Sequence, residues 1–168
     1  MDNGGKILVA VIENTVYIKP IGPAVQDNCL GLRDFIRAMT RRGCQRVAFD
    51  LDQCTAMDST FLGVIASAAM SNTHGRSKTV AILNADDEAK HELDMIGLLP
   101  VVMCREEEYD IPEEIELSEV DFVHLPQDER ERMERTKELH EELIKLNEKN
   151  RKQWGAFVEM LEEELQRG

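Results

Sequence analysis

Three consecutive polar residues, Asp58, Ser59 and Thr60, stand directly before an apolar stretch of the sequence. Asp favours the position just before a helix, because its carboxylate accepts the backbone N–H groups that the first turn leaves unpaired. Ser59 and Thr60 would then lie in the first turn with their hydroxyls near the surface. A hydroxyl there can cap the helix, or act as a nucleophile if a base is close. The nearest histidine in sequence is His74, about fifteen residues on, so the residues alone favour the capping role.

The elements around this segment predict how it is held. Val47–Leu51 is typical of a buried strand, residues 52–57 are predicted to form a short loop, and Ser59 to about Asn72 forms a helix that is apolar on most sides. Such a helix is either enclosed in a core or offers one face to a partner. Gly63, one turn into the helix, would let a neighbouring element approach closely.

The rest of the first hundred residues alternates between strand and helix patterns. Lys6–Glu13 and Val16–Pro20 predict an antiparallel hairpin, which Ile21-Gly22-Pro23 should end. The elements that follow are predicted at residues 25–42 (helix), 47–51 (strand), 59–72 (helix), 79–83 (strand), 86–96 (helix) and 101–103 (strand). This order indicates an α/β fold with a mixed, mostly parallel sheet of about four to six strands covered by helices.

The residues from the end of the strand at residues 47–51 into the apolar helix resemble a known family. A strand ending in Asp50-Leu51, a loop, and then Asp-Ser-Thr-Phe-Leu-Gly-Val-Ile at residues 58–65 are similar to the STAS domain, in particular to the anti-sigma-factor antagonists. The resemblance covers roughly Lys6 to Cys104 and includes the order of the elements. It implies a STAS-like α/β fold and a non-catalytic role in partner switching.

The resemblance also implies a site and its partners. In that family an anti-sigma-type Ser/Thr kinase phosphorylates the serine after the motif's Asp, and a Ser/Thr phosphatase reverses this. The matching serine is Ser59, with Thr60 as the second choice. The partner-binding residues carried over with it are Asp58, Ser59, Thr60, Phe61 and Leu62.

Two positions depart from the family pattern. Phe61 replaces the motif's first glycine, and its ring would either be buried or stand beside Ser59, where it could anchor or block a partner. The segment Gly22-Pro23-Ala24-Val25 lacks the acidic residue often found there. Both departures bear on the partner more than on the fold.

The chain divides by composition into residues 1–105, the STAS-like domain, residues 106–125, an acidic connector, and residues 126–168, a long amphipathic C-terminal helix with a possible interruption near Gly155. Val120–Leu125 within the connector alternates weakly and could form an edge strand. The apolar stripe of the C-terminal helix includes Trp154, Phe157 and Leu161, which we expect to make the tail's interactions. Folding back onto the domain and homodimerisation through this helix both stay open, because a strict heptad is absent.

Composition excludes several function classes. The formal net charge of −13 argues against nucleic-acid or anionic-membrane surfaces. The four cysteines and four histidines lack metal-ligand spacing, so we expect no metal, no cofactor and reduced, mostly buried thiols. No signal-peptide pattern or membrane-length apolar run is visible, which favours a cytoplasmic location. The competing hypothesis to a phosphorylation switch is a constitutive STAS scaffold or subunit of a transporter or signalling complex, binding through its C-terminal helix.

Overall fold

The computed structural model describes residues 4–71, 79–105, 118–119 and 128–168. The strands are β1 (Lys6–Ile12), β2 (Thr15–Ala24), β3 (Arg46–Asp50), β4 (Cys54–Met57), β5 (Val80–Leu83), β6 (Met103–Arg105) and β7 (Ser118–Glu119). The helices are α1 (Gln26–Cys29), α2 (Leu32–Arg41), α3 (Ser59–Ser71), α4 (Asp87–Ile96), the 3₁₀ turn η1 (Leu99–Val101), α5 (Glu129–Leu146) and α6 (Glu148–Arg167).

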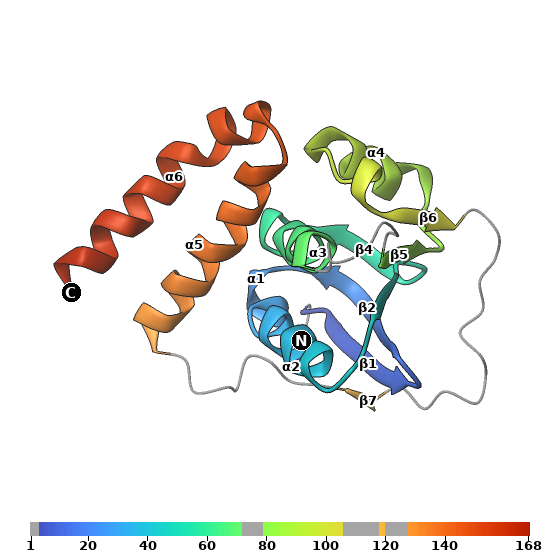
Figure 1. The fold of residues 1–168 in the computed structure, drawn as a ribbon. Helices are drawn as coiled ribbons and strands as arrows, with labels where there is room; N and C mark the ends of the chain where they lie inside the picture. The colour runs from blue at the N-terminus through green and yellow to red at the C-terminus, as the bar shows by residue number, and fades with distance from the viewer. Residues whose placement is uncertain (1–3, 72–78, 106–117, 120–127) are drawn as a thin grey trace.

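The strands form one mixed sheet in the order β6-β5-β3-β2-β1-β7, with β4 paired to β2. β1 pairs antiparallel with β2 and β7, while the pairs β2–β3, β2–β4, β3–β5 and β5–β6 are parallel. The predicted α/β class with a mixed, mostly parallel sheet is therefore confirmed. The parallel pairs require crossovers, and α2, α3 and α4 supply them (Figure 1).

The main core lies between the sheet and its covering helices. Ile18, Phe49 and Ile82 from the strands are fully buried there, together with Phe61 and Ile65 from α3. Because successive strand residues point to opposite faces, a second small cluster of Ala10, Tyr17, Ala48 and Leu83 lies on the other side of the sheet. α3 thus lies against the sheet on one side, and its start is placed by the end of β4.

Within residues 4–105, local structure differs from the sequence predictions at four places. The strand predicted at residues 101–103 begins only at Met103, since Leu99–Val101 form the 3₁₀ turn η1. β2 continues through Gly22 to Ala24, because Gly22 adopts a φ of 82° and the register with β4 shifts there. Cys54–Met57, predicted as loop, is the short strand β4, since β2 extends far enough to pair with it. The helix predicted over residues 25–42 is two helices, α1 and α2, separated at Leu30 and Gly31. The edge strand predicted at Val120–Leu125 lies outside the described residues.

The C-terminal segment is a hairpin of two helices instead of one long helix. The interruption falls at Asn147, where the backbone is extended (φ −167°, ψ 167°), and the Asn147 side chain accepts a 2.8 Å hydrogen bond from the Asn150 N–H to begin α6. Gly155, where an interruption was expected, lies inside α6. The prediction was wrong because the polar break in the apolar stripe at Asn147 and Asn150 is the N-cap of a second helix, and periodicity alone did not show that the chain turns there.

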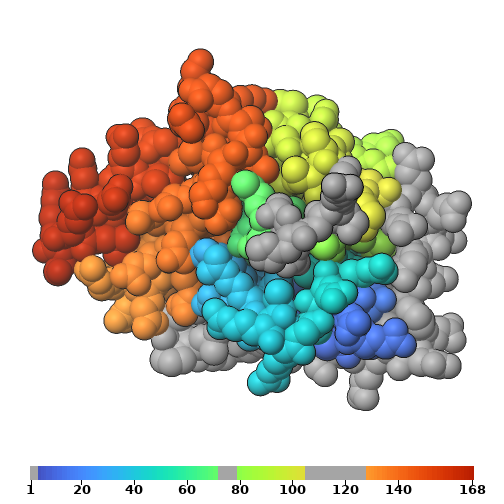
Figure 2. All heavy atoms as spheres, viewed as in Figure 1, coloured from blue at the N-terminus to red at the C-terminus, as the bar shows by residue number. Residues whose placement is uncertain are grey.

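The helical hairpin packs on its own domain. Figure 1 shows α5 beside α1 and α3, with α6 on the outer side of α5. Leu139 and Leu143 of α5 are fully buried and belong to the main core. In the space-filling view the hairpin lies directly against the rest of the chain (Figure 2). Of the two arrangements left open by the sequence, the structure has the self-packed one.

Candidate functional site

Asp58 fixes the start of α3. One carboxylate oxygen, Oδ1, accepts a 2.9 Å hydrogen bond from the Phe61 N–H, and its carbonyl accepts the Leu62 N–H at 3.0 Å. The other oxygen, Oδ2, accepts the N–H of Gln26 at 2.7 Å. Asp58 is therefore the predicted N-cap, and it also ties the first turn of α3 to the beginning of α1.

Ser59 is half-buried, and its hydroxyl meets a histidine from the C-terminal hairpin. Ser59 Oγ lies 2.9 Å from His140 Nε2, and His140 Nδ1 lies 2.7 Å from the carbonyl oxygen of Thr136. A carbonyl can only accept, so Nδ1 carries the proton and donates. In the neutral ring Nε2 is then an acceptor, and the Ser59 hydroxyl donates to it.

His140 is held in its neutral form. Its residue is only 2% exposed, and this burial lowers the pKa of the imidazole, against the opposing effects of the Thr136 carbonyl and the negative charge of Asp58. The rings of Trp154 and Phe157 on α6 contact it edge-on at centroid distances of 5.1 and 4.9 Å. Trp154 and Phe157, predicted as tail-interaction residues, therefore place His140 over Ser59. Leu161, the third of that set, is buried within the fold.

The residues after Ser59 lie inside the molecule. Thr60, Phe61 and Leu62 are 3%, 0% and 7% exposed. The Phe61 ring points inward and meets Phe49 of β3 edge-on, with centroids 5.9 Å apart. Of the two orientations considered for Phe61, the inward one is correct, so its ring is no anchor for a partner in this arrangement. Between the two candidate hydroxyls, the structure leaves Ser59 more accessible than Thr60.

α5 approaches α3 closely at Gly63. A Cβ atom built on Gly63 would lie 2.6 Å from the carbonyl oxygen of Leu139 and 2.9 Å from its Cβ, so only glycine fits beside this helix. The close approach expected at Gly63 is confirmed, and the element that makes it is the chain's own α5. On α3, this contact lies one turn after the contact between Ser59 and His140.

Polar contacts flank this apolar contact along α5. Towards its N-terminal end, Arg132 pairs with Asp27 at 3.5 Å and Arg135 with Asp34 at 2.9 Å. Thr136 Oγ1 accepts a 3.0 Å hydrogen bond from the Gln26 side chain. These contacts fix the register of α5 on α1 and α2.

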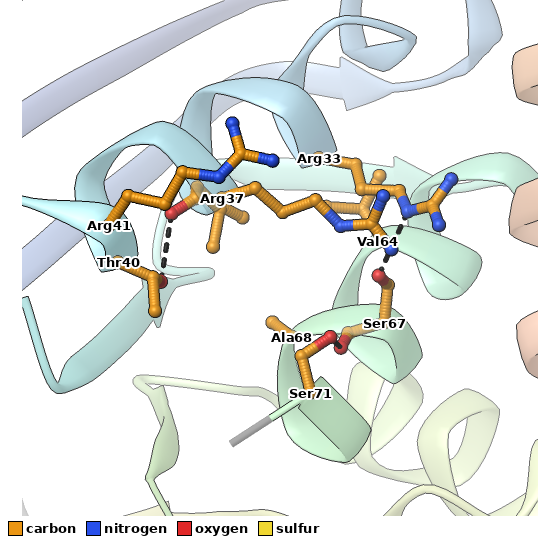
Figure 3. Close-up of a pocket in the computed structure, with 9 residues that line it drawn as sticks. Arg33, Arg37, Thr40, Arg41, Val64, Ser67, Ala68 and Ser71 are labelled. Atoms are coloured by element: carbon orange, nitrogen blue, oxygen red, sulfur yellow. Dashed lines mark hydrogen bonds between the residues drawn. The ribbon is translucent and has the colours of Figure 1, made fainter.

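Arg33 is the central residue of a second polar cluster. Its buried guanidinium donates to Ser67 of α3 at 3.1 Å, pairs with Glu138, and lies 4.0 Å from Glu142 of α5. Figure 3 shows Arg33 in a row with Arg37 and Arg41 along a cavity between α2 and α3. The volume of this cavity is about 220 Å³. The basic rim could hold a small anion, but Arg33 is already neutralised by the α5 carboxylates.

A second cavity, of about 390 Å³, opens beside Ser59. It is lined by Met57, Ser59, Leu62, His91, Glu92, Met95, Ile96, Lys149, Gln153 and Trp154. Partial burial, followed by the charges of Glu88 and Asp86, raises the pKa of Glu92. The cavity lies between α3, α4 and the beginning of α6, so its shape depends on the position of the hairpin.

The pairing of a serine hydroxyl with a neutral imidazole invites comparison with a nucleophile and its base. Here the Phe61 N–H in the first turn of α3 is already taken by Asp58, and His140 is covered by two aromatic rings. The geometry thus serves to connect α3 and α5. His140 was missed by the sequence analysis. Its position next to Leu139, on the apolar stripe of the C-terminal segment, indicates that it is buried.

The described segments hold no group of three or more His, Cys, Asp or Glu side chains arranged for a metal ion. The four cysteines, all within the described residues, form no disulfide; Cys29 and Cys44 are buried and the other two half-buried. Burial, reinforced by Asp58 and Asp27, raises the pKa of the Cys29 thiol well above its usual value. Among the described residues, no helix combines the length and apolar character needed to cross a membrane.

No protein-family model and no curated protein matches the chain. Solved structures do match. The anti-sigma factor antagonist SpoIIAA in its unphosphorylated form superposes with a TM-score of 0.51 at 19% identity, over 60% of this chain and 89% of that chain. The phosphorylated form of SpoIIAA, described as a Bacillus cell fate determinant, gives a TM-score of 0.49 at 18% identity, over 60% and 92% of the two chains. The chain thus shares its fold with SpoIIAA, and this is the STAS fold that the resemblance implied.

Proposed function

We propose that this chain is a non-catalytic, cytoplasmic protein-interaction switch that binds an anti-sigma-type Ser/Thr kinase and is controlled by phosphorylation of Ser59. The observation that carries the proposal is the position of the Ser59 hydroxyl. It stands in the first turn of α3, directly after the Asp58 cap, and is the more accessible hydroxyl of the pair. A Ser/Thr phosphatase would reverse the modification.

The physical basis of such a switch is the charge of the phosphate. Phosphorylation adds a charge of about −1.5 to −2 and three acceptor oxygens. The unpaired N–H groups and the dipole of a helix N-terminus tolerate an anion, so the isolated domain stays folded. A closed interface with a partner does not tolerate it, because the anion is desolvated there and repelled by Asp58. Phosphorylation would therefore abolish binding without unfolding the chain.

The structural neighbour supports this direction. SpoIIAA, which shares the fold, is an anti-sigma factor antagonist solved in its unphosphorylated form. In this chain, Asp58 and Ser59 occupy the positions that the antagonist motif assigns to the cap and the modified serine. The likeness in fold is the reason to test a kinase of that class first.

The test combines phosphorylation with binding. The purified chain is incubated with ATP and an anti-sigma-type Ser/Thr kinase from the same genome, and the phosphate is located by mass spectrometry. We expect modification of Ser59, no modification of Ser59→Ala, and loss of kinase binding in Ser59→Asp while the circular dichroism spectrum is unchanged. Binding of Ser59→Asp as tight as that of wild type would contradict the proposal.

A constitutive scaffold is the second candidate, and one observation favours it. The Ser59 hydroxyl already has a structural partner, since it donates to His140 within the same chain. In this alternative Ser59 only secures the hairpin, and partners bind the outer surface of α6, where Met160 is 55% exposed. A Met160→Asp variant that loses every partner, with Ser59→Ala silent, would select the scaffold over the switch.

A further inference from the structure

The face of α3 that begins at Ser59 is occupied by α5. Leu139 closes over Gly63, His140 accepts from Ser59, and Leu143 is buried one turn further along α5. A partner that reads Ser59 must reach this face, and the chain's own helix stands there. The proposed partner and α5 therefore require the same surface.

We propose that this face is a helix-binding groove, and that a partner engages it by presenting an amphipathic helix in place of α5. The inference rests on the proposed function for the role of Ser59, but the groove itself follows from the packing of α5. Amphipathic helices commonly bind grooves of this kind through apolar side chains at i and i+4. Leu139 and Leu143 have that spacing.

The contacts of α5 define the chemistry of the partner helix. Basic side chains at the positions of Arg132 and Arg135 face Asp27 and Asp34. One turn later, acidic side chains at the positions of Glu138 and Glu142 face Arg33. The resulting pattern has basic residues at 132 and 135, acidic residues at 138 and 142, and leucines at 139 and 143. A partner helix that fits the groove repeats this order of charge and apolar character.

The polar contacts of α5 are of two kinds. The Arg33–Glu142 pair is buried, whereas the Arg132–Asp27 pair and the Arg135–Asp34 pair are partly exposed to solvent. Partly exposed ion pairs contribute little, roughly 0–1 kcal/mol each. The second attachment is to the end of α4, where Asn147 and Asn150 donate to the carbonyl oxygen of Ile96 at 3.2 and 2.8 Å.

Because α5 is tethered, it competes at a high effective concentration, and a partner helix must bind more tightly than α5 does in order to displace it. Ser59 influences that competition. As a free hydroxyl it donates to His140, whereas a phosphate on Oγ removes this donor. Phosphorylation therefore weakens the hold of α5, and its charge also weakens the binding of a partner helix on the same face. Phosphorylation of Ser59 thus changes the affinity of this face for α5 as well as for the partner.

The test uses the full chain with α5 weakened and a defined helix supplied separately. Leu139→Asp combined with Leu143→Asp puts charges into the apolar contact and leaves the α3 surface unaltered. The probe is a fluorescein-labelled synthetic peptide of residues 128–168, and binding is measured by fluorescence anisotropy. The control is Met160→Asp, which places one of these two added charges on the exposed side of α6.

We expect the peptide to bind the double variant at least about tenfold more tightly than it binds wild type or Met160→Asp, because only the double variant has an open groove. A peptide that itself carries Leu139→Asp and Leu143→Asp should not bind. Absence of peptide binding to a double variant that keeps its circular dichroism spectrum and its amide protection in β3 and β5 would overturn the proposal.

If the double variant does not fold, Leu143→Ala gives a second measurement. We expect amide exchange in residues 129–146 to accelerate while β3 and β5 stay protected. Exchange of α5 only together with the sheet would show that α5 cannot leave by itself, and would also overturn the proposal. None of these measurements uses the kinase, so failure of Ser59 phosphorylation and failure of the groove give different results.

Discussion

Two glycines in this chain form a matched pair that tests whether α5 is seated on α3. Gly63 lies in α3 and Gly155 in α6, both in helix interiors. A Cβ at Gly63 would meet the backbone of Leu139 at 2.6 Å, whereas a Cβ at Gly155 would meet nothing within 4 Å. Substitution of either glycine by alanine improves helix propensity by the same amount, so the two variants differ in packing only.

The expected magnitudes follow from this difference. Gly155→Ala should raise the free energy of unfolding by about 1 kcal/mol, from propensity alone. Gly63→Ala has the same gain, but Leu139 presents backbone and Cβ atoms that cannot rotate away, and overpacking of this kind costs about 1–3 kcal/mol. We therefore expect Gly63→Ala to be less stable than Gly155→Ala by about 1–3 kcal/mol.

Urea unfolding of the two variants and the wild type gives the free energies, and hydrogen exchange locates the effect. In Gly63→Ala the faster exchange should be confined to α5 and α6, because the added methyl group meets Leu139 of α5 and not the strands β3 and β5. If Gly63→Ala were stabilised as much as Gly155→Ala, α5 would not lie against α3 at this position. The assignment of the occupied groove would then be wrong.

Three further predictions concern the same region. Because the pKa of His140 is lowered in the folded state, the stabilising contribution of its neutral ring is complete above the unfolded pKa of about 6.5 and is lost as the pH falls below that value. The urea midpoint of His140→Gln should lose this dependence over that pH range, while that of the exposed His91→Gln should keep it. Asp58→Ala removes the cap of α3 and the acceptor for Gln26 and should cost about 1–2 kcal/mol in urea unfolding, and a cost near zero would show that the cap is dispensable. Phe61→Ala empties a fully buried position and should cost about 3–5 kcal/mol in urea unfolding, whereas a mild effect would place the ring at the surface.

Local sequence patterns determined the domain's class and the start of α3. Apolar runs of four to eight residues alternating with helical periodicity require covered, mostly parallel strands, and Asp58 before an apolar segment specifies a cap through short-range hydrogen bonds. Gly63 signalled a close neighbour because the missing side chain leaves space beside the helix. Each of these inferences depends on residues within one or two turns of one another.

Tertiary structure alone decided which residues contact and cover Ser59 and its neighbours. The Ser59–His140 hydrogen bond joins residues 81 positions apart, and the direction of the Phe61 ring in α3 depends on its contact with Phe49 of strand β3. The short strand β4 exists because β2 runs on past Gly22 to meet it. The sequence of the amphipathic C-terminal segment was equally compatible with packing on its own domain and with packing on a second chain. An apolar stripe specifies that one face of a helix is buried, but it does not specify which surface buries it. The turn at Asn147 and the fit of Leu139 against Gly63 brought that stripe back onto α3, and so placed a helix of the chain itself on the serine from which the function is inferred.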